Sequence, residues 1–246
     1  INAFKSYQEI MTDVMSLPSA FTLDNIKNVF HDMKYPATFL NTLIATVIGT
    51  LGIIVIASMG GYKMARVKTR YSRFCFLFCI APMMIPFQSF MLTLVNVATT
   101  LHINGKIWGL AIIYWGLGAP MSIFLYQGFA KGIPLELEES ALIDGCNQFQ
   151  LFTRIIFPML KSCTATVTII NVMWIWNDFL LPLLMLGGRK SSKTLQLAAY
   201  SFMGQYKMEW QNIMSAAILI IIPALILYLI FQKSIIKGVV AGAVKG

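Results

Sequence analysis

The sequence predicts an all-helical protein that crosses a membrane several times, and composition gives the first reason. Hydrophobic residues make up 57% of the 246 residues, charged residues make up only 12%, and the mean hydropathy is +0.71. A soluble domain of this length carries roughly a quarter charged residues. Long apolar runs also alternate with short loops in which basic residues cluster. This alternation is typical of membrane-spanning helices and their connections.

Five runs are long and apolar enough to cross a bilayer, because a membrane helix needs about 20 mostly apolar residues. They cover residues 39–61, 74–95, 107–130, 162–188 and 213–232. One charged side chain, Asp178, occurs within them. Membrane helices tolerate internal proline where neighbouring groups or water satisfy the freed carbonyls. We therefore expect kinked helices around a cavity, with bends near Pro82, Pro86, Pro120, Pro182 and Pro223.

Basic residues predict the orientation of these spans. The 63–73 loop holds five of them and no acid: Lys63, Arg66, Lys68, Arg70 and Arg73. The positive-inside rule places this loop in the cytoplasm. Following the chain from there puts its N-terminus outside and its C-terminus inside. Residues 131–161 and the tail 233–246 then face the cytoplasm, whereas 96–106 and 188–212 face outward.

We expect residues 1–246 to form one transmembrane domain, because no repeat, linker or low-complexity stretch interrupts the chain. Residues 1–38 mix polar and apolar side chains and look like an ordered external segment rather than a domain. The net charge of +9 is explained by the loops between spans, so nucleic-acid binding is not expected. The cysteines and histidines lack metal-site spacing, which predicts no metal site and free, buried thiols at Cys75, Cys79, Cys146 and Cys163.

The 131–161 segment predicts two short helices joined by a bend. Pro134 suits the first turn of a helix, and Glu136, Glu138 and Glu139 complement its positive N-terminal end. Gly145 permits a positive φ and so ends that helix. A second, more apolar helix then leads toward Pro158. The acidic residues are poor ligands for an anionic membrane surface, so we expect them to face a protein partner.

This segment also resembles a known family signature. Glu139-Ser140-Ala141, then Gly145, then Ile155-Ile156-Phe157-Pro158 is similar to the E-A-A…G…I-x-L-P signature of permease subunits of ABC importers. Ser140 and Phe157 depart mildly from it. In that family the segment is the coupling helix, which docks in a cleft of the ATPase subunit. The resemblance therefore implies coupling residues at Glu138, Glu139, Ala141, Leu142, Asp144, Gly145, Phe149 and Pro158.

Three further stretches resemble the carbohydrate branch of that family. They are Tyr62-Lys63-Met64-Ala65-Arg66, Trp176-Asn177-Asp178-Phe179-Leu180-Leu181-Pro182, and the ending Ala241-Gly242-Ala243-Val244-Lys245-Gly246, which is similar to the maltose-transporter type of inner permease. The resemblance implies a type I ABC importer transmembrane-domain fold. Members usually have six spans, so one span is expected to precede the numbered chain.

The resemblance also implies a function. The chain would be a permease subunit in the bacterial cytoplasmic membrane, forming half of the path for a sugar or oligosaccharide. Its partners would be a homologous permease in a heterodimer, an ABC ATPase dimer, an extracellular solute-binding protein and membrane lipid. No G-x-x-x-x-G-K-[ST] loop occurs, so the chain itself should not be an enzyme. ATP and Mg would be bound by the partner ATPase subunits, and no cofactor or catalytic residue is expected here.

The fourth apolar run provides the candidates for the solute path: Asn171, Trp174, Trp176, Asn177 and Asp178. A charge inside a membrane should face protein or water. Aromatic faces and amide groups suit sugars, whose rings are apolar on their faces and hydroxylated at their rims. Two alternatives remain open, since Trp174 and Trp176 cannot share one helix face and Asp178 could pair with the sibling permease.

Two other functions compete with this interpretation. A secondary transporter or channel would need ion-coupling charges or inverted repeats, and Asp178 is the one charge within the spans. A membrane-embedded enzyme would need paired carboxylates, a His-Glu-x-x-His helix or a Ser-x-x-Lys motif, which the sequence lacks. The outward 188–212 loop is a candidate for docking the solute-binding protein, through Arg189, Lys190, Lys193, Tyr206 and Trp210, although a plain surface loop is the alternative.

Overall fold

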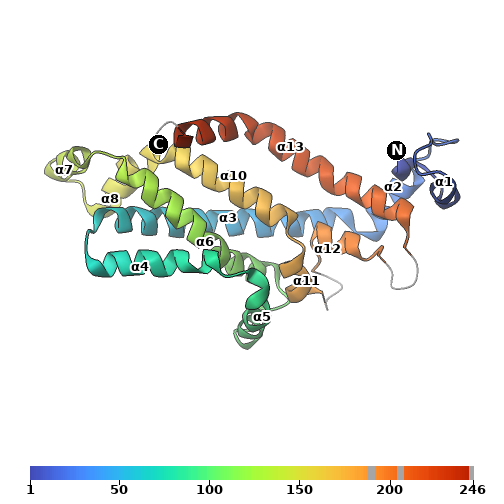
Figure 1. Cartoon of the computed structure of the whole chain (residues 1–246), viewed down its shortest axis with the longest axis horizontal. Coiled ribbons are helices and arrows are strands. Elements are labelled where there is room, and N and C mark those ends of the chain that lie inside the picture. The colour runs from blue at the N-terminus through green and yellow to red at the C-terminus, as the bar shows by residue number, and fades with distance from the viewer. Residues whose placement is uncertain (188–191, 204–207, 244–246) are drawn as a thin grey trace. The chain divides into compact units, whose positions relative to one another are not determined.

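A computed structural model describes residues 1–187, 192–203 and 208–243; the side chains of residue 227 and of residues 230–243 lie outside this description. Within those ranges every regular element is helical, apart from an isolated bridge between Met203 and Met208 (Figure 1). The all-helical prediction is therefore confirmed.

The main helices are α1 (Tyr7–Thr12), α2 (Asp24–Asp32), α3 (Tyr35–Arg66), α4 (Arg70–Ile80), α5 (Met91–Thr100), α6 (Ile107–Lys131), α7 (Leu135–Ile143), α8 (Gln148–Gln150), α9 (Phe157–Met159), α10 (Lys161–Asn177), α11 (Leu180–Leu186), α12 (Leu195–Tyr200) and α13 (Trp210–Ala243).

The chain divides into two compact units. The first comprises Ile1–Ala45, Ala98–Leu110 and Trp176–Ile230, and the second comprises Thr46–Val97, Ala111–Ile175 and Phe231–Gly246. Four long helices, α3, α6, α10 and α13, each contribute residues to both units. We describe the packing of each unit separately.

Two of the expected spans are uninterrupted helices. α3 and α6 are each long and apolar enough to cross a membrane. Both end on basic residues: Lys63 and Arg66 lie in the last turn of α3, and Lys131 lies in the last turn of α6. The apolar run at 213–232 lies within α13, which continues through Pro223.

The expected second span is not one helix. α4 ends at Ile80, and two short 3-10 turns, Ala81–Met84 and Phe87–Ser89, precede α5. The interruption has a clear cause, because Pro82 and Pro86 lack the backbone N–H that a continuing helix needs, and their rings clash with the preceding turn. The expectation of a single helix over 74–95 was therefore wrong.

The fourth expected span is also divided. α10 ends at Asn177 and α11 begins at Leu180. The Leu180 N–H donates to Asp178 Oδ1 at 3.1 Å, so the aspartate side chain supports the turn where the helix breaks. At its other end, α10 follows the helical stretch Gln148–Met159 at an angle of 75°, and the two together are apolar and long enough for one bent span.

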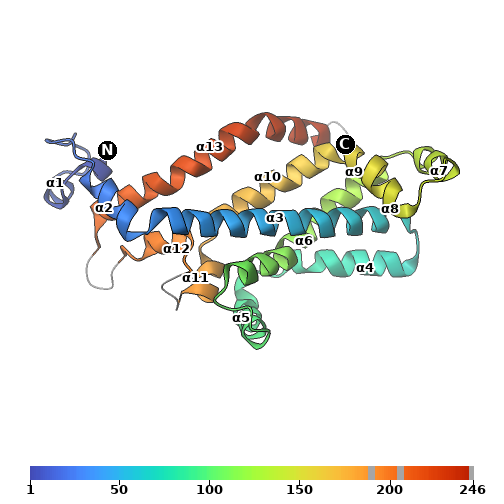
Figure 2. The same ribbon diagram turned by 180° about the vertical axis from the view of Figure 1, so that it is seen from behind.

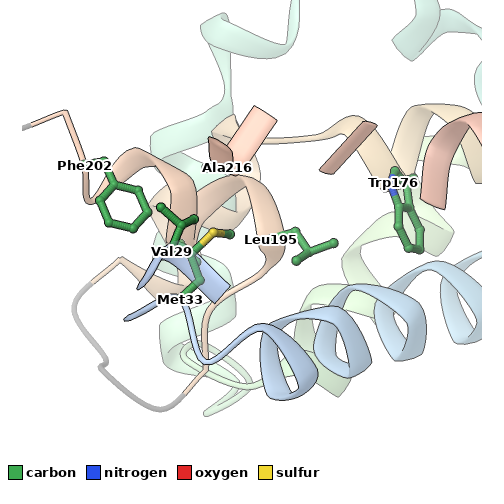
Figure 3. Close-up of a cluster of buried hydrophobic side chains, with 7 residues drawn as sticks. Val29, Met33, Trp176, Leu195, Phe202 and Ala216 are labelled. Carbon is green, nitrogen blue, oxygen red and sulfur yellow. The ribbon is translucent and has the colours of Figure 1, made fainter. Parts of the chain in front are cut away.

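The core of the first unit joins α2, α12 and α13 to the start of α3 and the end of α10. Figure 3 shows Val29, Met33 and Phe202 gathered at one end of this cluster, with Leu195 between them and Trp176. Phe39 meets Trp176 edge to face, with ring centroids 5.7 Å apart. The Tyr35 hydroxyl donates to the Leu219 carbonyl at 3.0 Å, which ties α3 to α13. These contacts hold the start of α3 against the end of α10 and against α13.

The N-terminal segment is ordered around a buried lysine. Lys5 is fully buried, and its ammonium donates to the Asp13 carbonyl at 3.0 Å and the Val14 carbonyl at 3.2 Å. Buried charges persist where hydrogen bonds replace the lost water, as they do here. Close by, hydrogen bonds from Ser19 and Ser6 lower the pKa of Glu9 to about 2.

Close helix packing in the second unit depends on glycine. Figures 1 and 2 both show the latter part of α3 running beside α6. A Cβ added at Gly61 of α3 would lie 2.7 Å from Tyr126 Cβ and 3.0 Å from the Gln127 nitrogen. The sequence therefore permits the two backbones to approach as small residues do in membrane helix pairs.

Gly61→Ala should consequently destabilise the protein. The added methyl group must push α3 from α6, and overpacking of this kind costs about 1–3 kcal/mol. Gly128→Ala in α6 is the matched control, because a Cβ there meets nothing within 4 Å and alanine favours a helix by up to about 1 kcal/mol. Thermal unfolding in detergent measures both, and a Gly61→Ala midpoint at or above that of Gly128→Ala would contradict this packing.

Candidate functional site

The segment from α7 to α9 is built as two short helices around a left-handed glycine. α7 begins at Leu135, one residue after Pro134, so the proline precedes the first turn instead of occupying it as expected. Gly145 has a φ of +85°. The Cys146 N–H donates to the Ala141 carbonyl at 3.0 Å and the Gly145 N–H to the Leu142 carbonyl at 3.1 Å. This pair of bonds is a Schellman motif, which ends α7 at the predicted glycine.

The helix after the bend is started by a reciprocal cap. Asn147 Oδ1 accepts from the Gln150 N–H at 2.9 Å, and Gln150 Oε1 accepts from the Asn147 N–H at 3.0 Å. α8 then continues as a π-helical turn over Leu151–Ile156 into α9. The two short helices expected from the sequence are therefore present, and their bend is only a few residues long.

An ion pair anchors α7 to the end of α3. Arg66 Nε and Glu138 Oε1 lie 2.5 Å apart, and the same guanidinium donates to the Ile133 carbonyl at 2.9 Å. The Tyr62 hydroxyl donates to Glu138 Oε2 at 2.7 Å. The ring centroids of Tyr62 and Phe152 are also 5.7 Å apart. Because Phe152 lies in the second short helix, that helix packs against the same tyrosine. We call Tyr62, Arg66 and Glu138 the α7 anchor.

The position of Glu138 corrects one expectation. We expected the acidic residues of this segment to face a partner, but Glu138 is only 8% exposed and both of its oxygens are used inside the second unit. Ala141, one helical turn later, is also buried. These two coupling candidates therefore hold α7 in place from within.

The other coupling candidates are exposed, and so is Ile143, which lies between Leu142 and Asp144. Ile143 is 86% exposed and Phe149 is 69% exposed, although neither lies in one of the expected membrane spans. Apolar and acidic groups thus share one surface at the bend. We call this surface the α7–α8 tip, and its other exposed members are Glu139, Leu142, Asp144 and Gly145. Pro158 is also exposed but lies in α9, outside the tip.

Figure 2 shows α7 and α8 at the C-terminal end of α3, where the α7 anchor lies. The sequence marks the stretch containing Tyr62 and Arg66 but does not connect it to Glu138. Glu138 and Ala141 are spaced i, i+3, which puts them on one helix face. The same spacing relates Glu139 to Leu142, so the pattern groups these residues by face without saying which face is buried.

The five solute-path candidates have different environments. In the second unit, Asn171 is buried and its amide donates to Ser122 Oγ at 3.1 Å, which joins α10 to α6. Trp174 is 39% exposed and packs edge to face on Tyr114, with centroids 5.3 Å apart. Trp174 therefore presents an accessible aromatic surface.

The remaining three candidates belong to the first unit. Trp176 is 1% exposed, so it is a core residue and is not accessible to a solute in this structure. Asn177 is exposed and Asp178 is half-buried. The structure thus separates Trp174 from Trp176, as their spacing along the helix required.

The described residues contain no group of three or more His, Cys, Asp or Glu side chains that could hold a metal ion. All four cysteines are free thiols. The expectation that all four are buried was wrong for three of them, because Cys75, Cys79 and Cys146 are half-buried and Cys163 alone of the four is buried.

Comparison with known proteins identifies a family and several relatives. Residues 52–240 match the family described as binding-protein-dependent transport system inner membrane component. The chain is 39% identical to a probable starch degradation products transport system permease protein, AmyC, of Thermoanaerobacterium thermosulfurigenes, over 100% of this chain and 89% of that protein. It is 37% identical to the multiple sugar-binding transport system permease protein MsmG of Streptococcus mutans, over 99% and 88%.

Two further similarities extend this set. The chain is 32% identical to the melibiose/raffinose/stachyose import permease protein MelC of Bacillus subtilis, over 93% of this chain and 83% of that protein. Its fold matches a chain from the crystal structure of a bacterial ABC transporter involved in the import of the acidic polysaccharide alginate. That match has a TM-score of 0.79 and 22% identity, and covers 94% of this chain and 86% of the other.

The α7 anchor predicts a local stability effect. Glu138→Gln should expose residues 133–145 to faster amide exchange, because a hydrogen bond to a charged group contributes about 1.5–3 kcal/mol, or roughly 10- to 100-fold in the opening equilibrium. Glu139→Gln is the matched control, since Glu139 is exposed on the same helix. Hydrogen–deuterium exchange of the purified variants makes the comparison, and equal exchange in the two would count against the anchor.

Proposed function

Because the chain belongs to the family of binding-protein-dependent transport system inner membrane components, we propose that it forms half of the path by which an ABC importer admits a sugar or oligosaccharide. It is a permease subunit of an importer. The other half would come from a homologous permease in a heterodimer, and the solute would arrive on an extracellular binding protein. The sugar class is supported by relatives named for starch degradation products and for melibiose, raffinose and stachyose.

The energy for transport would enter through a partner. The sequence holds no phosphate-binding loop of the G-x-x-x-x-G-K-[ST] type, so ATP and Mg would be bound by an ABC ATPase dimer. We propose that the α7–α8 tip docks on this dimer. One observation carries this proposal: the tip exposes the apolar side chains of Ile143 and Phe149, while the α7 anchor fixes the helix that bears it to α3.

Apolar contacts would supply most of the docking affinity. Full burial of a side chain such as Ile143, Leu142 or Phe149 contributes about 1.5–3 kcal/mol. An exposed ion pair of Glu139 or Asp144 with a partner contributes about 0–1 kcal/mol. The carboxylates would therefore select the docking geometry more than the strength. Because the anchor connects α7 to α3 without a flexible linker, a movement of the docked tip would be passed to a membrane helix.

Docking at the tip would fix the topology of the whole chain. The α7–α8 tip and the tail 233–246 would lie in the cytoplasm, and residues 1–38 would lie outside. The loop at 188–212 would then face the binding protein through Lys193 and Trp210, whereas Arg189, Lys190 and Tyr206 lie outside the described residues. The side chains of the tail likewise lie outside the described part.

Trp174 is the residue of the solute path that we propose makes direct contact. Its ring is accessible, and its edge-to-face contact with Tyr114 holds it in one orientation. An oriented aromatic face suits the apolar face of a sugar ring. In the first unit, Asn177 and Asp178 would supply polar contacts to the solute.

Gly145→Val should uncouple ATP hydrolysis from transport. Valine is strained at a φ of +85° even though the space around Gly145 is open, so the bend and the tip geometry should change. Gly145→Asn is the conservative control, because asparagine tolerates the left-handed region. In proteoliposomes holding the whole complex, we expect sugar uptake per ATP to fall about tenfold or more for valine and less than about threefold for asparagine. Uptake per ATP unchanged by valine would refute the coupling role.

Trp174→Ala should lower sugar uptake without changing how strongly the binding protein stimulates ATP hydrolysis by the complex. Loss of an aromatic contact of about 0.5–1.5 kcal/mol predicts a threefold to tenfold lower uptake at limiting sugar. Trp108→Ala, which removes another exposed tryptophan, is the control. Both variants could transport like the wild type while sugar still stimulates ATP hydrolysis by the complex. The direct-contact role of Trp174 would then be wrong, and the importer assignment would stand.

A further inference from the structure

A large open cavity lies beside the base of α7 in the second unit. Its volume is about 1160 Å³, and its walls come from the end of α3, the 67–69 turn, the start of α4, the end of α6 and the start of α7. Five basic residues and one acid line it: Arg66, Lys68, Arg70, Arg73, Lys131 and Glu136. We call it the basic cavity. None of these charged residues belongs to the α7–α8 tip.

Among the described residues, nothing neutralises four of its cations. Arg66 is paired with Glu138, but within the described part of the chain Lys68, Arg70, Arg73 and Lys131 make no ion pair. Glu136 is the one carboxylate among the lining residues. Like charges held in one concave site repel each other unless an anion joins them, so the arrangement favours an anionic ligand.

The cations come from different elements that line the cavity. Arg70 and Arg73 lie on the first turn of α4, whereas Lys131 ends α6. Arginine presents a planar fork of donors that matches phosphate oxygens, and lysine adds a mobile point charge. A phosphate placed between these helix ends would therefore meet donors from both sides.

The apolar part of the cavity distinguishes a lipid from a soluble anion. Phe76 and Leu77 line the wall next to the cations. Beyond them, α4 exposes Phe74 and Phe78, whose rings stack 6.3 Å apart. A soluble phosphate would gain nothing from this surface, but acyl chains would cover it. The depth of the cavity in the membrane also suits a headgroup. α3 and α6 both pass from apolar to basic residues here, as spans do at the headgroup region.

We propose that the basic cavity binds the phosphate headgroup of an anionic phospholipid, with the acyl chains lying along α4. The phosphate bridges Arg70 and Arg73 to Lys131, beside the point where α7 begins. Glu136 disfavours a second negative charge near it, so a headgroup with one phosphate fits best. The proposal holds whichever solute the importer carries, because it uses no residue of the solute path or the α7–α8 tip.

The test counts lipids on the complete importer complex, purified in detergent and titrated with phosphatidylglycerol under native mass spectrometry. Replacing Lys68, Arg70 and Arg73 together by glutamine should lower phosphatidylglycerol affinity by at least about tenfold. The matched control replaces Lys63, Arg154 and Lys161 by glutamine, which removes the same charge from exposed residues of the same unit that do not line the cavity. This control should change affinity by less than about twofold.

Further arms separate the possible sources of the anion. Phosphatidylcholine should bind at least about tenfold more weakly than phosphatidylglycerol, and millimolar inorganic phosphate should not displace the lipid. Lys131→Gln, on a different helix, should lower affinity about fivefold and serves if the triple variant does not fold. Equal losses in the cavity and control variants, displacement by inorganic phosphate, equal binding of phosphatidylcholine, or no phosphatidylglycerol on the wild-type complex would each overturn the proposal.

Discussion

The burial of Glu138 against Arg66 and Tyr62 is the constraint on which the arrangement of the second unit depends. A carboxylate at the edge of a membrane protein is costly to bury unless a cation and hydrogen bonds replace its water. Here the guanidinium of Arg66 and the hydroxyl of Tyr62 do so, and both belong to the last turns of α3. The pair therefore fixes α7 to a membrane helix, and the exposed face of α7 can be apolar because its buried face supplies the attachment.

Breaks in the helices are the second feature that shapes the chain. Pro82 and Pro86 divide α4 from α5, and Asp178 supports the turn between α10 and α11. At such breaks the backbone groups need partners other than the helix, which in a membrane means protein or a water-filled cavity. Asp178 lies at the break and Trp174 lies one turn before it. Two of the residues that we propose for the solute path are therefore close in sequence to a break in the helix.

Hydropathy predicted α3 and α6 to within a few residues, because a long apolar run has few alternatives to a helix. The local rule for Gly145 was equally reliable, since left-handed backbone at the end of α7 suits glycine. Length and apolarity did not locate the breaks at residues 81–90 and 178–179. The prolines did predict a bend near Pro82 and Pro86, but not that the helix would be divided there. They also did not reveal that Glu138 points inward while Glu139 points outward, because this depends on Arg66, which is 72 residues away. Long-range pairing was the part that local patterns could not supply.

Docking of the exposed α7–α8 tip on an ATPase is the central claim, and site-specific photocrosslinking tests it directly. A benzophenone amino acid at Ile143 in the assembled importer should crosslink to the ATPase subunit, because this side chain is 86% exposed at the tip. The same amino acid at Phe78, which is 70% exposed on α4, should not. Crosslinking of position 143 to the solute-binding protein, or to no ATPase subunit while the complex remains active, would contradict the account.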